Sequence, residues 1–221
     1  MRKIISKALT AGAVAATTVA LVAVPASASG TWTINPAGGV SGFNTQNVGA
    51  LDLTTHAVVS CNESSATGNV PVGGSGLAGA GIAELTDVTF SNNGGACPAT
   101  GGILVTITTS ASATNAWSFN ADSYNSTTHV TTGTLTNISA SIHGSDGCDA
   151  TVGGPGGGTG TINGTYDNDD QTLRVSGNNL VVQTADAQCD PNLINVGDQI
   201  QLTGEYIVVT DSGPNLVVTS P

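Results

Sequence analysis

The chain has 221 residues, and its 15 acidic side chains face only four Lys and Arg, for a formal net charge of −11. Three of these cations, Arg2, Lys3 and Lys7, lie at the start, so the rest of the chain keeps only Arg174 and a net charge of about −14. Nucleic-acid binding needs Lys and Arg to neutralise phosphate, and docking on anionic lipid needs them too. We therefore expect this chain to bind neither nucleic acid nor anionic lipid.

The first 28 residues have the three parts of a secretory signal peptide. Basic residues open the segment, an uncharged apolar run covers 8–24, and the small residues at 26–28 form a cleavage site. The apolar run is shorter than the ~20 residues of a membrane-spanning helix. We therefore expect cleavage after Ala28 and a product that is secreted, or held loosely in the cell envelope, with no membrane association.

Beyond residue 28 the dominant pattern is alternation of apolar with polar residues, rich in Thr, Val and Ile, which is typical of half-buried antiparallel strands. Clusters of Gly, Asn, Ser and Pro between these segments predict turns. The clearest alternating segments are 103–108, 117–122, 137–142 and 200–208. Residues 29–221 are therefore expected to form a single all-β domain, an antiparallel β-sandwich or β-barrel. With two Trp, three Phe and three Tyr in the chain, its core must consist mainly of Val, Ile, Leu and Ala.

Four cysteines are present, at positions 61, 97, 148 and 189. An even number in an exported chain predicts two disulfides, and no C-x-x-C pair suggests zinc. Of the three possible connectivities we favour Cys61–Cys97 with Cys148–Cys189, because these keep the loops short and place one crosslink in each half of the chain. Each would contribute about 3–4 kcal/mol in the chain-entropy model.

A weak internal repeat runs through the middle of the chain. Residues 85–100 and 135–151 each contain a strand pattern followed by a cysteine, and a hairpin with a tyrosine comes after each, at 124–130 and 166–175. A solenoid needs at least three copies. Two copies indicate pseudo-symmetry inside one closed or two-sheet β structure.

Several short motifs resemble those of a group of small secreted actinobacterial β-rich proteins of unknown function. The motifs are Thr31–Pro36, Gly76–Ile82, Val88–Ser91, Thr131–Thr136, Cys148–Thr151, Gly164–Asp167 and Leu193–Asp198. The resemblance implies a secreted β protein of a Gram-positive bacterium. It contributes no functional residues, because the group has no established activity.

The most concentrated charge is the acidic hairpin 167–170, which contains Asp167, Asp169 and Asp170. Clustered carboxylates can hold Ca²⁺ through their oxygens. The spacing does not fit an EF-hand, and tight turns also prefer Asn and Asp. We expect a plain turn, with the three carboxylates as a weaker candidate for a Ca²⁺ site.

No catalytic motif stands out. The run His143–Asp146 contains an imidazole, a hydroxyl and a carboxylate, but catalytic triads are assembled from distant segments rather than from one loop. Carboxylates for glycoside cleavage would have to come from Glu63, Glu84, Glu205 or an Asp, and nothing in the sequence shows two of them facing each other.

Trp32 and Trp117 are candidates for stacking on a sugar ring, although the alternation of Trp117 with Phe119 favours a role in the core. We expect no cofactor and no catalytic residue. The preferred interpretation is a non-catalytic extracellular protein whose partner is a protein or glycan. The alternatives are a carbohydrate- or Ca²⁺-binding module and a hydrolase with an unrecognised site.

Overall fold

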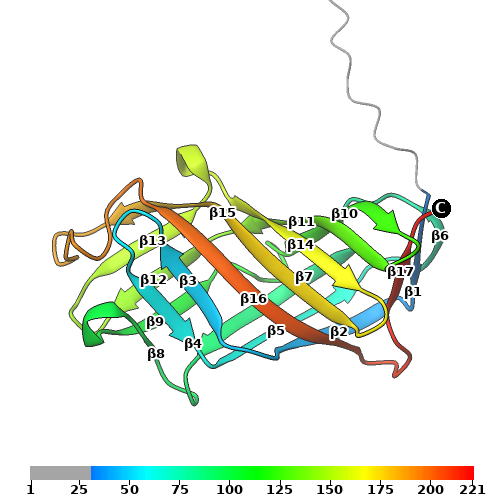
Figure 1. Cartoon of the computed structure of the whole chain (residues 1–221), viewed down its shortest axis with the longest axis horizontal. Coiled ribbons are helices and arrows are strands. Elements are labelled where there is room, and N and C mark those ends of the chain that lie inside the picture. Colours follow the sequence, from blue (N-terminus) through cyan, green and yellow to red (C-terminus); the bar gives the residue numbers. More distant parts are fainter. Residues whose placement is uncertain (1–30) are drawn as a thin grey trace, which may run out of the picture.

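The computed structural model describes residues 31–221, and the expected signal peptide and its cleavage site lie outside these residues. The described chain is almost entirely β-structure, with two short 3₁₀ turns at Thr100–Gly102 and Pro155–Gly157 (Figure 1). Every strand pairing in it is antiparallel, so the predicted all-β antiparallel fold is confirmed.

The strands are β1 (Trp32–Asn35), β2 (Gly38–Asn44), β3 (Val48–Asp52), β4 (Val58–Cys61), β5 (Glu63–Val70), β6 (Gly74–Leu77), β7 (Ala83–Ser91), β8 (Cys97–Pro98), β9 (Leu104–Thr109), β10 (Trp117–Asn125), β11 (Val130–Ile138), β12 (Ala140–Gly144), β13 (Asp149–Gly153), β14 (Gly160–Asp167), β15 (Thr172–Ala185), β16 (Gln199–Thr210) and β17 (Val217–Thr219).

Eight of these strands form a closed ring. The order is β16-β2-β5-β7-β10-β11-β14-β15, and β15 pairs back with β16 from Thr172–Ile207 to Val181–Gln199. Closure leaves no free strand edge in the ring, which removes the unpaired backbone groups that invite aggregation. The structure is therefore a β-barrel, which was one of the two architectures expected.

The remaining strands of the large sheet extend the same barrel. β3 pairs with the first part of β16, β13 pairs with the last part of β15, and β8 meets β4 through a single bridge between Val59 and Ala99. The resulting order, β16-β3-β4-β8-β9-β12-β13-β15, matches the order of the first ring. Six pairs of strands are therefore each one long strand interrupted near its middle, and the structure is an elongated up-and-down barrel. The pairs are β2/β3, β4/β5, β7/β8, β9/β10, β11/β12 and β13/β14.

One end of the barrel is covered by a separate three-stranded sheet, β17-β1-β6, here called the lid (Figure 1, right). Trp32, Ile34 and Val218 of the lid are buried in the core. The side-chain amide of Asn168, from the acidic hairpin, fastens the lid: its Nδ2 donates to the carbonyl of Val218, and its Oδ1 accepts from the Val218 N–H, both at 2.8 Å. The other end, here called the mouth, is formed by the loops 53–57, 99–103, 145–148 and 186–198.

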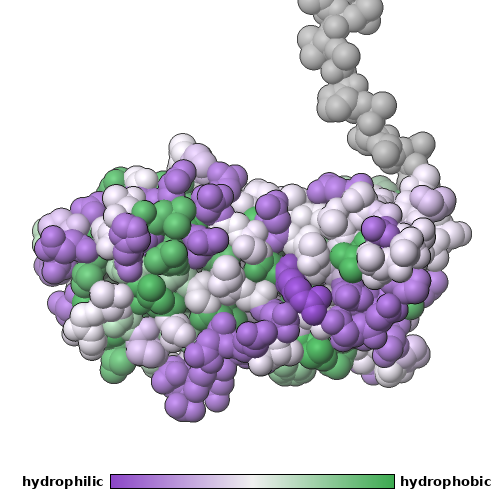
Figure 2. Space-filling view, viewed as in Figure 1, coloured by the Kyte–Doolittle hydropathy of each residue, from purple (hydrophilic) through white to green (hydrophobic). Residues whose placement is uncertain are grey.

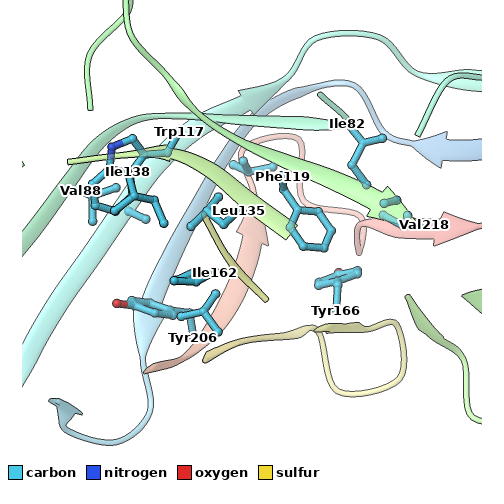
Figure 3. Close-up of a cluster of buried hydrophobic side chains, with 14 of the residues drawn as sticks. Ile82, Val88, Trp117, Phe119, Leu135, Ile138, Ile162, Tyr166, Tyr206 and Val218 are labelled. Atoms are coloured by element: carbon cyan, nitrogen blue, oxygen red, sulfur yellow. The ribbon is translucent and has the colours of Figure 1, made fainter. Parts of the chain in front are cut away.

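Large and small side chains alternate inside the barrel. Gly133 and Gly164 are register partners on β11 and β14, and a Cβ atom at Gly164 would lie 2.7 Å from the ring of Phe119. The two glycines therefore make room for this ring, which projects into the same interior as Leu135, Ile162 and Tyr206 (Figure 3).

Both tryptophans belong to the core. Trp117 is 3% exposed and Trp32 is 6% exposed. The predicted core role of Trp117 is confirmed, and neither indole presents a face to solvent on which a sugar could stack.

The two disulfides pair as predicted, Cys61 with Cys97 and Cys148 with Cys189. One bond lies in each half of the chain, as expected, but both lie in the mouth half of the barrel. Halves of the sequence do not correspond to halves of the molecule, because each long strand runs through both halves of the barrel. Cys61–Cys97 crosslinks β4 and β8, which share only the Val59–Ala99 bridge, so the bond closes the ring where hydrogen bonds are fewest.

Removing the Cys61–Cys97 bond should cost more stability than removing Cys148–Cys189. The bonds span 36 and 41 residues, so the chain-entropy model gives each about 4 kcal/mol. Cys61→Ser/Cys97→Ser also opens the weakest seam of the ring, and we expect its additional loss to be on the order of 1 kcal/mol. Urea unfolding of the two double variants measures the difference, and an equal or smaller loss for the Cys61/Cys97 pair would contradict the proposed role.

Candidate functional site

A cavity of about 100 Å³ lies inside the mouth of the barrel. Its lining comes from β3, β4, β9, β12 and β16 and from all four mouth loops. Most of the lining is aliphatic, with Ala50, Val59, Ile142, Ile194 and Ile200 as typical members. The surface around it is also apolar in part, since Figure 2 shows hydrophobic residues gathered on the mouth half of the molecule (left).

The apolar space continues inward. A second cavity of about 80 Å³ lies next to the first and reaches Trp117 near the middle of the barrel. Ala50, Val59, Ile142 and Ile200 line both cavities and therefore lie between them. The mouth therefore leads to an interior that small aliphatic side chains leave partly unfilled.

Asp52 is the unusual member of the lining. It ends β3 and is 4% exposed, and the alternation along the strand places its side chain on the same face as Ala50. Its Oδ1 accepts hydrogen bonds from the backbone N–H groups of Thr54 (2.8 Å) and Thr55 (2.9 Å), which holds the turn after β3.

The second oxygen of this carboxylate has no partner. Asp52 Oδ2 is buried and accepts no hydrogen bond from any residue in 31–221. Leaving a buried polar atom unpaired costs roughly 1–3 kcal/mol, and more when the group is charged, so such atoms are uncommon and require an explanation.

Three carboxylates belong to the lining of the mouth cavity, although its accessible surface is almost entirely apolar. Asp52, Asp146 and Asp190 line it, whereas no Lys, Arg or His belongs to its lining. Asp190 Oδ1 accepts from the backbone N–H of Asn192 at 2.9 Å, and Asp146 Oδ1 accepts from that of Cys148 at 3.2 Å. A positively charged group in the cavity would thus meet carboxylates and no competing cation.

The loop 186–198, which covers one side of the cavity, is held at both ends. The Cys148–Cys189 bond ties its start to the beginning of β13. Near its end, Asp198 Oδ2 accepts from the backbone N–H of Asn195 at 2.8 Å and from its side chain at 3.1 Å. These contacts fix the wall of the mouth and thereby the shape of the cavity.

The acidic hairpin lies at the opposite end of the barrel from this cavity. Asp167 Oδ1 accepts from the backbone N–H of Asp169, Asp169 pairs with His129 at 2.9 Å, and Asp170 pairs with Arg174 at 2.8 Å. Arg174 also lies 3.9 Å from Asp167 Oδ2, so the three carboxylates are occupied by His129, Arg174 and the backbone of the turn, and this arrangement does not favour the Ca²⁺ alternative.

The run 143–146 does not assemble a catalytic group. His143 Nδ1 hydrogen-bonds Asp149 at 2.7 Å, and Ser145 Oγ accepts from the backbone N–H of Leu104 at 3.0 Å. Within the described chain, the one close group of three possible metal ligands is Cys148, Asp186 and Cys189, and its two sulfurs are joined in the disulfide.

None of the three glutamates lines the mouth cavity. Glu63 Oε2 accepts from Ser91 and from the backbone N–H of Gly94, and Glu205 accepts from Thr45 and Arg174. The sequence did not point to Asp52, the buried carboxylate in the lining of the cavity. The available signal was its place in the alternation after Val48 and Ala50, which puts a carboxylate on the inward face of a strand.

No family model, no curated protein and no solved structure matches the chain. Across residues 31–221, no helix has the length and apolar character needed to cross a membrane. The interpretation of the mouth cavity therefore depends on its own geometry and chemistry.

The pairing of Asp170 with Arg174 predicts a small dependence of stability on pH. The hydrogen bond from Arg174 holds the pKa of Asp170 below its ordinary value. A carboxyl whose pKa is lower in the folded state contributes stability above its unfolded pKa, and loses it as the pH falls through the folded pKa. Both side chains are nearly half exposed, so Asp170→Asn should cost less than about 1 kcal/mol at pH 7 and nothing at acidic pH.

Urea unfolding at pH 7 and at pH 2.5 would measure this difference. Asp122→Asn is the matched control, because Asp122 is exposed and makes no ion pair within the described chain. A loss for Asp170→Asn that is equally large at both pH values would show that the ion pair is not the cause.

Proposed function

We propose that this protein is a secreted, non-catalytic binding protein that holds a small, mainly apolar ligand in the mouth cavity. The observation that carries the proposal is the cavity itself, an aliphatic space of about 100 Å³ at the loop-bearing end of a closed barrel. Ligand sites in proteins are concave and mostly apolar, with a few polar groups, and the mouths of β-barrels are among their common positions.

The size of the space suits a compact ligand. An apolar cavity of about 150 Å³ is large enough to bind benzene. The mouth cavity has about 100 Å³, and it reaches comparable room only if the shared wall side chains let it join the neighbouring cavity of about 80 Å³. A branched or cyclic group of at most about six carbon atoms is therefore the favoured size of ligand.

The composition of the lining favours this function over the alternatives. Sugar hydroxyls need many hydrogen-bond partners, and the lining supplies mainly Ala, Val, Leu and Ile. A hydrolase needs an activated nucleophile or an acid–base pair. The lining includes no Ser, His or Lys, and its Cys148 is in a disulfide. Its three carboxylates, Asp52, Asp146 and Asp190, each accept hydrogen bonds from the backbone of their own turns.

Secretion is supported by three features. The first 28 residues have the pattern of a signal peptide, the four cysteines form two disulfides, and the rest of the chain is strongly acidic. Disulfides persist in oxidising compartments, and a high net negative charge keeps a released protein soluble.

A panel of small cyclic and branched compounds should raise the melting temperature of the protein. We propose cyclohexanol, cyclohexylamine and 3-methylbutanol as probes, with glucose as the carbohydrate arm. A ligand at ten times its Kd adds about 1.4 kcal/mol, which corresponds to a rise of roughly 3–6 °C for a domain of this size. Burial of apolar surface should also give a negative heat-capacity change in calorimetry.

Ala57→Phe, which adds a ring to the cavity wall, should remove the effect. Ala187→Phe is the matched control, because Ala187 is exposed and does not line the cavity. The proposal fails if no compound of the panel other than glucose raises the melting temperature, or if the rise survives Ala57→Phe.

A further inference from the structure

Resting on the proposed function, we infer that the mouth cavity selects ligands that carry a protonated amine beside their apolar body, and that Asp52 Oδ2 accepts a hydrogen bond from this amine. The inference begins from the unpaired oxygen. Among the buried side-chain nitrogen and oxygen atoms of residues 31–221, Asp52 Oδ2 is the one without a hydrogen-bond partner. Asp52 is also a residue of the cavity lining.

The turn after β3 fixes the direction of this carboxylate. Its Oδ1 is occupied by the N–H groups of Thr54 and Thr55, so the side chain cannot turn Oδ2 outward without breaking both hydrogen bonds. Asp52 is also a register partner of Ile200, a residue of the cavity wall. The acceptor is therefore fixed before a ligand binds, but Oδ2 is fully buried, so an amine in the cavity reaches it only when the wall side chains beside it move aside.

The chemistry of the lining favours a ligand with a positively charged hydrogen-bond donor. A carboxylate only accepts hydrogen bonds, and charge-assisted bonds from an ammonium are stronger than those from a neutral hydroxyl. Asp146 and Asp190 add further negative charge to the same lining, and the lining has no basic residue to neutralise them. The same three carboxylates would repel an anionic ligand.

The position of Asp52 along the barrel sets the orientation of the ligand. Asp52 is the last residue of β3, next to the mouth loop 53–57, whereas Ala50 and Val48 lie farther into the barrel on the same face. Ala50 borders the second cavity, which Val48 also lines. The amine would stay near the mouth, and the apolar body would point inward toward the second cavity.

Burying an ammonium is unfavourable unless it is paired, so the ion pair must have good geometry to contribute. The most direct test therefore compares the affinity of an amine with that of a neutral compound of the same shape. Cyclohexylamine, cyclohexanol and cyclohexanecarboxylate share one ring and differ in the polar group alone. Calorimetric titration of the whole secreted protein at pH 7 compares the three.

We expect cyclohexylamine to bind at least tenfold more tightly than cyclohexanol, a difference of about 1.4 kcal/mol. The carboxylate should show no measurable binding. In Asp52→Asn the advantage of the amine should fall below threefold, because Asn keeps an oxygen for the turn and presents an N–H₂ group in place of Oδ2. Asp122→Asn, which changes an exposed carboxylate outside the cavity, should preserve the advantage.

The outcomes separate this inference from the proposed function. Equal binding of amine and alcohol would overturn the amine selectivity while leaving an apolar site in place. An unchanged advantage in Asp52→Asn would overturn the role of Asp52. Absence of binding by every ring compound would overturn the proposed function and the inference with it. The ligand series uses the unmodified protein, so its result does not depend on whether the variant folds.

Discussion

The pairing of β15 with β16 is the constraint on which the rest of the structure depends. It joins the two ends of an eight-stranded antiparallel sheet into a ring. An eight-stranded ring has an interior that side chains can just fill or that can hold one small ligand. The outcome depends on the side chains available, and this chain has only two Trp, three Phe and three Tyr. Phe119, Tyr166 and Tyr206 leave cavities of only about 50 Å³ in the lid half, whereas the mouth half contains mainly Ala, Val and Ile, and a cavity of about 100 Å³ remains.

The mouth keeps its cavity because its walls are crosslinked. A ring lined with small side chains could collapse onto the space inside it, or open at its weakest seam. Cys61–Cys97 closes the seam between β4 and β8, and Cys148–Cys189 fixes the loop 186–198 beside the cavity. The lid end is held by hydrogen bonds instead, through Asn168 and Val218. The two ends of the barrel therefore differ in construction, with a packed lid and an open, carboxylate-lined mouth.

The sequence predicts much of the local structure, because alternation along a strand depends only on neighbouring residues. Val105 is buried and Leu104 is 50% exposed, as the pattern of 103–108 indicates. The choice between sandwich and barrel was not predictable, since it depends on the register between β15 and β16. The Gly-rich segment 154–159 interrupts the long strand β13/β14, and from the sequence it looks like an ordinary turn between two strands. Asp52 was missed because its burial depends on residues such as Leu193 and Ile194, about 140 positions away.

A crystal structure of the protein under xenon pressure would test most directly whether closure of the ring leaves an apolar cavity at the mouth. Xenon enters dry apolar cavities and can be located by its scattering. We predict xenon in the space bordered by Ala50, Ile142 and Ile200. A mouth that contains no xenon, and is instead filled by side chains or by hydrogen-bonded water, would contradict this picture of the barrel.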